Sequence, residues 1–386
     1  MTTIMTKTVK GSLLTGIAMA ALCTASAGHA QSLRIALGLP EIWGAYDPLV
    51  SFAETLKSEA GLDAEVFALS LLSLAETPAG VRDGVADMGL VVFPYFPAEY
   101  SEVNLIANLS MLATTGKQVE VPGAAMLGAS MEYTMLDCAD CQAELSDQNQ
   151  VFIAGMSTGP YALMCTEPLA SIEEVAGRRF RAGAANFARW AEEFGGSTVS
   201  VTGNEIYTAM SQGTVDCTMN SVGDLLGNRY IDVTKAVTLG APGGVFAGVG
   251  AANVNRDSWE SLTEEQRGAV IKAAAQLAAD TAIRFHEDDT KALAAAKEQG
   301  LEIIEAPAEM MKATEEFLAK DIEVVKQQFT DNYGVENVAE KVDRFQRLVE
   351  KWKGLVEEAG TDAGKLGELY WTEVHSKIDP ASYGLD

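Results

Sequence analysis

Apolar runs of strand length alternate with amphipathic segments near the start of the chain. Strands are predicted at residues 32–37, 63–69 and 88–93, and short helices at residues 52–60 and 79–83. This strand–helix–strand–helix–strand order is typical of a parallel sheet with helices on both faces. The pattern therefore predicts a first α/β unit.

The same order returns further along the chain. Strands are predicted at residues 161–166, 179–182, 198–201 and 215–219, with helices at residues 171–175, 187–194 and 205–212. A long apolar run at residues 245–255 is expected to return as a strand to the first unit. Two α/β units joined by crossing strands would form a hinged clamshell, with ligands beyond the carboxyl ends of the strands.

The clearest helical pattern begins near Ser261. Ser261 and Glu264 have the spacing of a capping box, and the amphipathic pattern continues to about residue 298. At 1.5 Å per residue this helix is roughly 55 Å long, enough to lie across two lobes. Further helices are predicted at residues 310–328, 338–359 and 366–374.

These elements predict an α/β fold: a two-lobed clamshell with crossing hinge strands, a long domain-spanning helix and a C-terminal helical extension. Lobe I is predicted to comprise residues 31–158 and 246–280. Lobe II is predicted to comprise residues 159–245 and 281–386, including the C-terminal helices. A chain of 386 residues is long enough for two such domains.

Residues 1–30 have the pattern of a signal peptide. Two lysines precede an apolar stretch at residues 11–22, which is too short to span a bilayer, and small residues at 28–30 suit cleavage. No twin-arginine pair is present, so the general secretory route to the periplasm is expected. Cys23 raises the alternative of a lipoprotein, but Leu22 is not the small residue that a lipobox has before its cysteine.

Charge narrows the set of partners. The formal charge is −26, and removal of residues 1–30, which hold two lysines and no acid, would change it to −28. Such a chain is not expected to bind nucleic acid or anionic lipid surfaces. No later segment reaches about 18 uninterrupted apolar residues, so direct membrane insertion is not expected either. An anionic ligand would need a cation inside its site, because the outer field repels it.

Four cysteines remain after residue 30, at positions 138, 141, 165 and 217. An even number in an exported protein favours structural disulfides, and three pairings are possible. Cys138–Cys141 is the favoured pair, which leaves Cys165 and Cys217 to join if the fold brings them together. Cys138 and Cys141 form a CxxC, so an exported thiol redox protein is the alternative. No second CxxC completes a zinc site, and no metal is expected.

Catalytic motifs are not found in the sequence. After residue 30 the only histidines are His286 and His375, and no GxSxG elbow, P-loop or HExxH is present. The glycine-rich stretches at residues 240–244 and 248–250 do not fit GxGxxG. We therefore expect neither an enzyme nor a cofactor.

The most informative stretch lies between residues 177 and 220. It begins with GRRFR at residues 177–181, continues with FGG at residues 194–196, and ends with EIYTAMSQGTVDCTMN at residues 205–220. In this order the three motifs resemble the second-domain signature of the substrate-binding proteins of tripartite ATP-independent periplasmic (TRAP) transporters, the family named after dicarboxylate uptake.

Other segments extend the resemblance over residues 32 to about 305. GVADM at residues 84–88 and NRDSWESL at residues 255–262 are similar to further motifs of that family. The resemblance implies a periplasmic binding protein that captures a small organic acid and delivers it to TRAP membrane subunits. A periplasmic sensor or scaffold would have the same fold.

The resemblance also assigns ligand-binding residues. In the family, the last arginine of the strand forms a salt bridge to the ligand's carboxylate, and here that residue is Arg181. Asn220 is at the position of the family's asparagine and can donate to the same carboxylate. A guanidinium suits this role because it offers two parallel donors and keeps its charge. Arg178, Arg179 and Arg189 are expected to be solvated.

Departures from the family pattern narrow the range of ligands that are expected. Tyr161 replaces a second basic residue of some relatives, and Gly203 replaces a frequent aromatic. Where binders of acid sugars have polar groups, this chain has Val92, Phe93, Tyr95 and Phe96. Trp43 is a further candidate for the wall of the site. We therefore expect a monocarboxylate, or a modest organic acid with an apolar or aromatic part.

Overall fold

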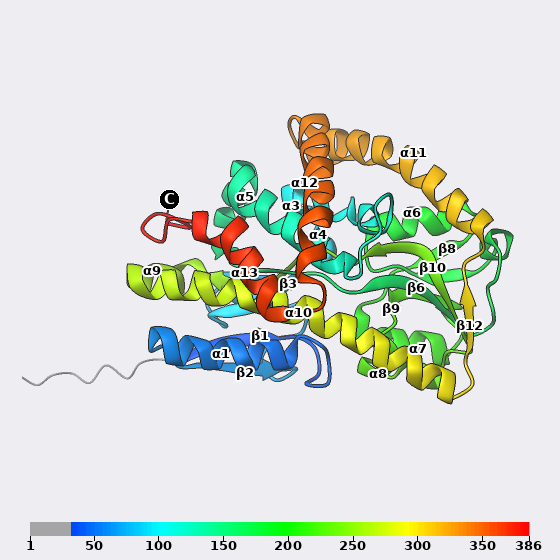
Figure 1. Ribbon diagram of the computed structural model, residues 1–386, viewed down its shortest axis with the longest axis horizontal. Helices are drawn as coiled ribbons and strands as arrows, with labels where there is room; N and C mark the ends of the chain where they lie inside the picture. Colours follow the sequence, from blue (N-terminus) through cyan, green and yellow to red (C-terminus); the bar gives the residue numbers. More distant parts are fainter. Residues whose placement is uncertain (1–31, 386) are drawn as a thin grey trace, which may run out of the picture. The chain divides into compact units, whose positions relative to one another are not determined.

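The computed structural model describes residues 32–385, which form two mixed β-sheets with helices packed on them (Figure 1). The signal peptide predicted at residues 1–30, with Cys23, lies outside the described residues. No helix among the described residues has both the length and the apolar character needed to cross a bilayer.

The first sheet has the strand order β2-β1-β3-β11-β4, and β5 also pairs with β11. Its strands are β1 (Leu33–Leu37), β2 (Ala64–Ala68), β3 (Met88–Val92), β4 (Gln150–Val151), β5 (Gly155–Met156) and β11 (Val249–Asn255). The first three are parallel, as their sequence pattern predicts, whereas β11 runs antiparallel to β3. The helices α1 (Tyr46–Ala60) and α2 (Thr77–Arg82) connect the parallel strands.

The second sheet has the order β12-β10-β6-β9-β7-β8. Its strands are β6 (Pro160–Cys165), β7 (Arg179–Arg181), β8 (Ser197–Val199), β9 (Cys217–Ser221), β10 (Ala236–Val245) and β12 (Glu302–Glu305). Strand β7 is parallel to β8 and β9, and β6 is antiparallel to β9 and β10. The helices of this part are η4 (Ile172–Val175), α6 (Ala185–Glu193), η5 (Gly203–Glu205), α7 (Ile206–Ser211), α8 (Asp224–Gly227) and η6 (Tyr230–Asp232).

Two short segments cross from one sheet to the other side by side. One links β5 to β6 and the other links β10 to β11. The backbone N–H of Thr158 donates to the carbonyl of Phe246 at 3.1 Å, and the N–H of Phe246 donates to Thr158 Oγ1 at 3.0 Å. The single strand predicted at residues 245–255 is therefore wrong in detail. The run divides because β10 belongs to one sheet and β11 to the other, with Gly248 at a positive φ of 78° between them.

The long helix is α10 (Glu264–Glu298), which confirms the predicted domain-spanning helix. Its capping box is formed by Thr263 and Gln266, two residues after the predicted start. We call each sheet, with the helices that connect its strands, a unit. Helix α10 contacts α1 of the first sheet's unit and also α8 and β12 of the second sheet's unit (Figure 1). One rigid element therefore contacts the helices and strands of both units.

The remaining elements complete the layers. They are η1 (Phe93–Tyr95), α3 (Ser101–Ala107), η2 (Ser110–Thr114), α4 (Pro122–Glu132), the π-helical turn η3 (Tyr133–Asp137), α5 (Ala139–Asp147), α9 (Arg256–Ser261), α11 (Ala308–Tyr333), α12 (Val338–Ala359), α13 (Ala363–Glu373) and η7 (His375–Lys377). Helix α12 packs on α4, where Gly128 lets the ring of Trp352 approach closely, and α13 packs on α10 and α4. Helices α12 and α13 therefore pack on α4 and, through α13, on the long helix α10.

Candidate ligand-binding site between the two sheets

Arg181 is the last residue of β7 and is 2% exposed. The close approach of Gly183 leaves room for its side chain, since a Cβ there would lie 2.9 Å from Nη1. The guanidinium donates to the carbonyl of Val201 at 3.1 Å, to Asn220 Oδ1 at 3.4 Å and to Tyr95 Oη at 3.0 Å. A guanidinium has five N–H donors, so two remain for a ligand.

Ion pairing distinguishes Arg181 from the arginines near it in sequence. Arg179 pairs with Asp216, Arg189 with Asp321, and Arg178 lies 3.7 Å from Glu167. The prediction that Arg189 is solvated is wrong. Its side chain is only 16% exposed and is paired with the buried Asp321. Arg181 has no carboxylate partner within 4 Å among residues 32–385. It is therefore a buried cation without an internal counter-ion in contact.

Asn220 connects Arg181 to an acidic residue that sequence reasoning missed. The Asn220 amide oxygen accepts from Arg181 and from Thr218 Oγ1, and its nitrogen donates to Asp224 Oδ2 at 2.8 Å. Asp224, the first residue of α8, also accepts from Trp43 Nε1 at 3.3 Å and from Asn228 Nδ2 at 2.7 Å. Burial raises the pKa of the Asp224 carboxyl. The site thus holds a guanidinium and a carboxylate separated by one carboxamide.

The turn that carries these groups is anchored to the long helix. Asp289 of α10 accepts hydrogen bonds from Ser221 Oγ and from the backbone N–H of Gly223 at 2.7 Å. Burial raises the pKa of the Asp289 carboxyl to about 7. Because Ser221 and Gly223 lie between Asn220 and Asp224, this contact positions both side chains relative to α10.

Aromatic side chains surround the polar network. Tyr161 stacks on Phe187 with ring centroids 4.6 Å apart and on Phe246 at 6.0 Å. Trp43 meets Phe285 edge to face at 5.1 Å, and the Tyr230 hydroxyl donates to the carbonyl of Gly203 at 2.6 Å. These ring contacts and hydrogen bonds set the orientation of the aromatic walls.

A cavity of about 60 Å³ lies between these groups. Its lining comes from the first sheet's unit, the crossing segments and the second sheet's unit, and includes Trp43, Val92, Tyr95, Tyr161, Arg181, Asn220, Asp224, Asn228, Tyr230 and Phe246. A larger groove of about 470 Å³ shares Tyr95 with it and is lined by Phe96 and by residues 182–185 and 198–202. The structure therefore brings together every predicted site residue except Phe96, which lines only the groove.

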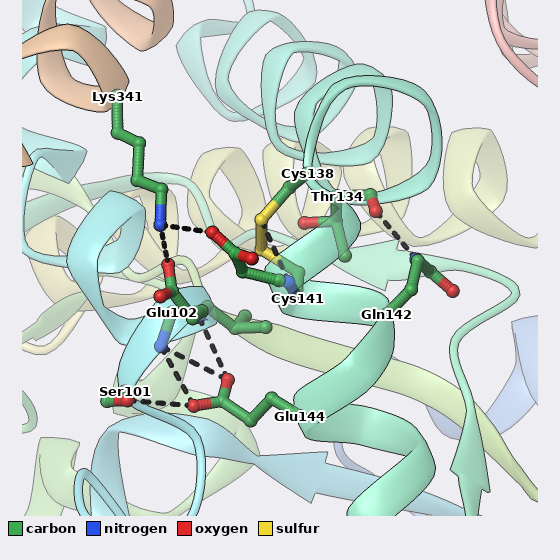
Figure 2. The surroundings of a disulfide bond; sticks show 10 residues. Ser101, Glu102, Thr134, Cys138, Cys141, Gln142, Glu144 and Lys341 are labelled. Atoms are coloured by element: carbon green, nitrogen blue, oxygen red, sulfur yellow. Dashed lines mark hydrogen bonds and ion pairs between the residues drawn. A yellow bond between two sulfur atoms is a disulfide. The ribbon is translucent and has the colours of Figure 1, made fainter. Parts of the chain in front are cut away.

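The four described cysteines form two disulfides in different parts of the fold. Cys138–Cys141 and Cys165–Cys217 are both disulfides, and the second joins directly opposed residues of β6 and β9. Figure 2 shows the first at the start of α5, where Cys138 Sγ accepts from the backbone N–H of Cys141 at 3.0 Å. Ligand atoms of Glu102 and this pair lie within 4.8 Å of one another. Both sulfurs are used by the disulfide, however, and it is the thiolate that binds metals.

Several charged side chains around this disulfide have partners (Figure 2). Lys341 bonds Glu102 and Asp140, both at 2.7 Å. Glu144 accepts from Ser101 Oγ at 2.9 Å and from the backbone N–H groups of Glu102 and Val103 at the start of α3. Burial raises the pKa of the Glu144 carboxyl to about 7.

A two-sheet α/β fold, with paired crossing segments and a small cavity that holds a few charged and polar groups between the sheets, is the architecture expected of a solute-binding protein. The family of bacterial extracellular solute-binding proteins, family 7 (DctP), matches residues 48–331, and the chain belongs to this family. The family supports the solute-binding interpretation and not the alternative of a thiol redox protein.

Individual relatives are distant but similar along most of the chain. A solute-binding protein of Albidiferax ferrireducens is 22% identical over 250 residues, which are 64% of this chain and 71% of that protein. A TRAP periplasmic solute-binding protein of Bordetella bronchiseptica, solved with bound mandelate, is 18% identical with a TM-score of 0.69, covering 83% of this chain and 99% of its own. One of Rhodoferax ferrireducens, solved with bound malonate, is 19% identical with a TM-score of 0.66, covering 84% and 99%.

Proposed function

We propose that this protein captures a small organic acid in the periplasm and delivers it to the membrane subunits of a TRAP transporter. The observation that carries the proposal is the buried Arg181, which lines a cavity between the sheets, has donors to spare, and contacts no carboxylate within the described part of the chain. A ligand carboxylate supplies the missing counter-charge and accepts both donors. Tyr161, Trp43, Tyr95 and Asn220 form the walls and second contacts, and Phe96 contacts a ligand that extends into the groove.

The proposed motion follows from the contacts across the cavity. Tyr95 and Trp43 come from the first sheet's unit, and they bond Arg181 and Asp224 of the second. Opening the crossing segments would break these two hydrogen bonds and expose the cavity. We therefore propose that the two sheets with their helices are the lobes of the clamshell, and that residues 157–159 and 246–248 are hinges.

Relatives support the ligand class. The proteins of similar fold from Bordetella bronchiseptica and Rhodoferax ferrireducens were solved with the carboxylates mandelate and malonate. The signal peptide expected at residues 1–30 would direct this chain to the periplasm by the general secretory route.

A thermal-shift screen against an organic-acid library tests the proposal, since a ligand that binds only the folded state raises the melting temperature. We expect at least one carboxylate to stabilise the wild-type protein and not Arg181→Ala. Arg179→Ala is the matched control, because it removes a neighbouring arginine that is paired with Asp216 outside the cavity. A ligand that stabilises Arg181→Ala as much as wild type would contradict the proposed binding mode.

A further inference from the structure

The cavity holds a charge that a simple organic acid leaves without a partner. Asp224 is 9% exposed and lines the same cavity as Arg181. Its carboxylate accepts hydrogen bonds from three neutral donors, on Trp43, Asn228 and Asn220. No cationic side chain lies within 4 Å of it in the described part of the chain. A carboxylate offers about four acceptor positions, so one is left over.

Two buried charges of opposite sign therefore line one cavity without touching. A ligand that carries only a carboxylate would satisfy Arg181 and add a second anion next to Asp224 in a low-dielectric environment. Buried charges are tolerated when they are paired. A ligand with both a carboxylate and a cationic nitrogen would pair both residues and bring no net charge into the site.

The position of Asn220 fixes the order of the two charges. Its amide oxygen faces the Arg181 guanidinium and its amide nitrogen faces the Asp224 carboxylate. A ligand that lies along Asn220 with its carboxylate at Arg181 therefore brings atoms a few bonds away next to Asp224. The amino group of an amino acid is at such a separation from its carboxylate.

The aromatic lining is consistent with a cationic nitrogen. Five aromatic residues line the cavity: Trp43, Tyr95, Tyr161, Tyr230 and Phe246. The face of an aromatic ring attracts a cation, and groups of such rings are used to bind alkylated ammonium ions. The net charge of −26 also favours an uncharged ligand over an anion during approach, because a zwitterion is not repelled as a whole.

We propose that the ligand is a small ammonium carboxylate, with its carboxylate on Arg181 and its nitrogen between Asp224 and the aromatic side chains. This inference rests on the proposed function, since it names the class of organic acid that the same site binds. It changes the expectation from a plain monocarboxylate to a zwitterion, and it gives Asp224 the role of a specificity-determining residue.

Pairs of ligands with the same shape test the inference by calorimetry on the full mature protein. The pairs are glycine and propanoate, alanine and 2-methylpropanoate, and trimethylglycine and 3,3-dimethylbutanoate, in which a carbon replaces the nitrogen. For the pair that fits the cavity, we expect the zwitterion to bind at least about tenfold more tightly than its carbon analogue. Lactate, with a hydroxyl in place of the ammonium, should bind more weakly than alanine.

Asp224→Asn provides the second measurement. It keeps a side chain of the same shape, and we expect it to weaken binding of the zwitterion and strengthen binding of the carbon analogue. A general loss of structure would weaken both, so opposite changes identify a charge effect. The wild-type ratios decide the question even if this variant does not fold.

Each outcome separates this inference from the proposed function. Carbon analogues that bind as tightly as the zwitterions, or lactate equal to alanine, would overturn the cationic nitrogen while leaving carboxylate capture intact. Failure of all three zwitterions, while the screen returns an acid without nitrogen, would overturn it in the same way. A screen that returns no carboxylate at all would overturn both.

Discussion

The region beside Cys138–Cys141 and the cavity both contain buried or partly buried charged side chains, and they differ in how those charges are satisfied. Beside Cys138–Cys141, Lys341 is held by two carboxylates, and Glu144 accepts hydrogen bonds from the first residues of α3 (Figure 2). In the cavity, Arg181 and Asp224 are more deeply buried, yet among residues 32–385 neither has an oppositely charged side chain in contact.

This difference in charge pairing distinguishes a region that stabilises the fold from one that binds a ligand. A paired cluster joins elements that are distant in sequence, as Lys341 of α12 does with α3 and α5, and it has no need of a ligand. Buried charges without direct partners are costly to the empty protein, and that cost is relieved when a ligand supplies the opposite charge. We therefore interpret the first region as a structural joint and the cavity as the binding site.

The largest expected effect concerns the structural region. Burial raises the pKa of Glu144 from 4.5 to about 7. Between these pH values the unfolded chain releases a proton that the folded protein keeps, so the free energy of unfolding falls as the pH rises and levels off above about 7. The loss is roughly 3 kcal/mol, at about 1.4 kcal/mol per pKa unit. Glu144→Gln should not show this loss, as measured by urea unfolding at several pH values.

Comparing the two proteins at each pH isolates Glu144. Asp289, whose pKa is also raised to about 7 by burial, is present in both and its contribution cancels. The Gln side chain keeps a neutral acceptor for the N–H groups at the start of α3. Any loss of stability that does not depend on pH shifts the free energy of unfolding by the same amount at every pH. Ligand affinity should be the same in both proteins. A stability difference that does not change between pH 4.5 and 8 would mean that Glu144 is ionised in the fold at all these values.

The second effect concerns the cavity, where a substitution should change ligand affinity and not stability. Arg181→Ala should weaken ligand binding by about 1.5–3 kcal/mol, which is roughly tenfold to a hundredfold, because it removes charge-assisted hydrogen bonds. Its melting temperature without ligand should not fall. Arg181→Lys should recover only part of the affinity, because an ammonium cannot present two parallel donors. Equal affinity of the Lys variant and wild type in calorimetry would argue against bidentate binding.

The sequence predicted the parts of the fold that have a periodic pattern. The parallel strands β1, β2 and β3 are short, mostly apolar runs, and α10 has one polar side, so both kinds of element were recognisable. Helix α4 was not, because ten of its eleven residues are buried and no polar face marks it. The division between β10 and β11 was missed for a similar reason, since both strands are apolar and only tertiary pairing separates them.

The site was predictable only as far as the family motif extends. Arg181 and Asn220 lie within the recognised segments, whereas Asp224 follows four residues after Asn220 and belongs to none of them. No motif in the sequence around Asp224 indicates that this residue lines the same cavity as Arg181. Its partner Trp43 is 181 residues away in the chain, and Asp224 becomes a buried cavity residue only when the two sheets meet.

The smallest expected effect concerns Asn220, which bridges the two charges. Asn220→Ala removes one neutral donor to the ligand carboxylate, so calorimetry should show a loss of about 1 kcal/mol, or roughly fivefold in affinity. It also removes a donor to Asp224, which should raise the pKa of that carboxyl further and weaken binding more at pH 5 than at pH 8. Thr218→Val is the control, because its hydroxyl bonds only the Asn220 oxygen. If Asn220→Ala weakens binding as much as Arg181→Ala, the amide does more than add one contact, and it must hold the guanidinium in place for the ligand.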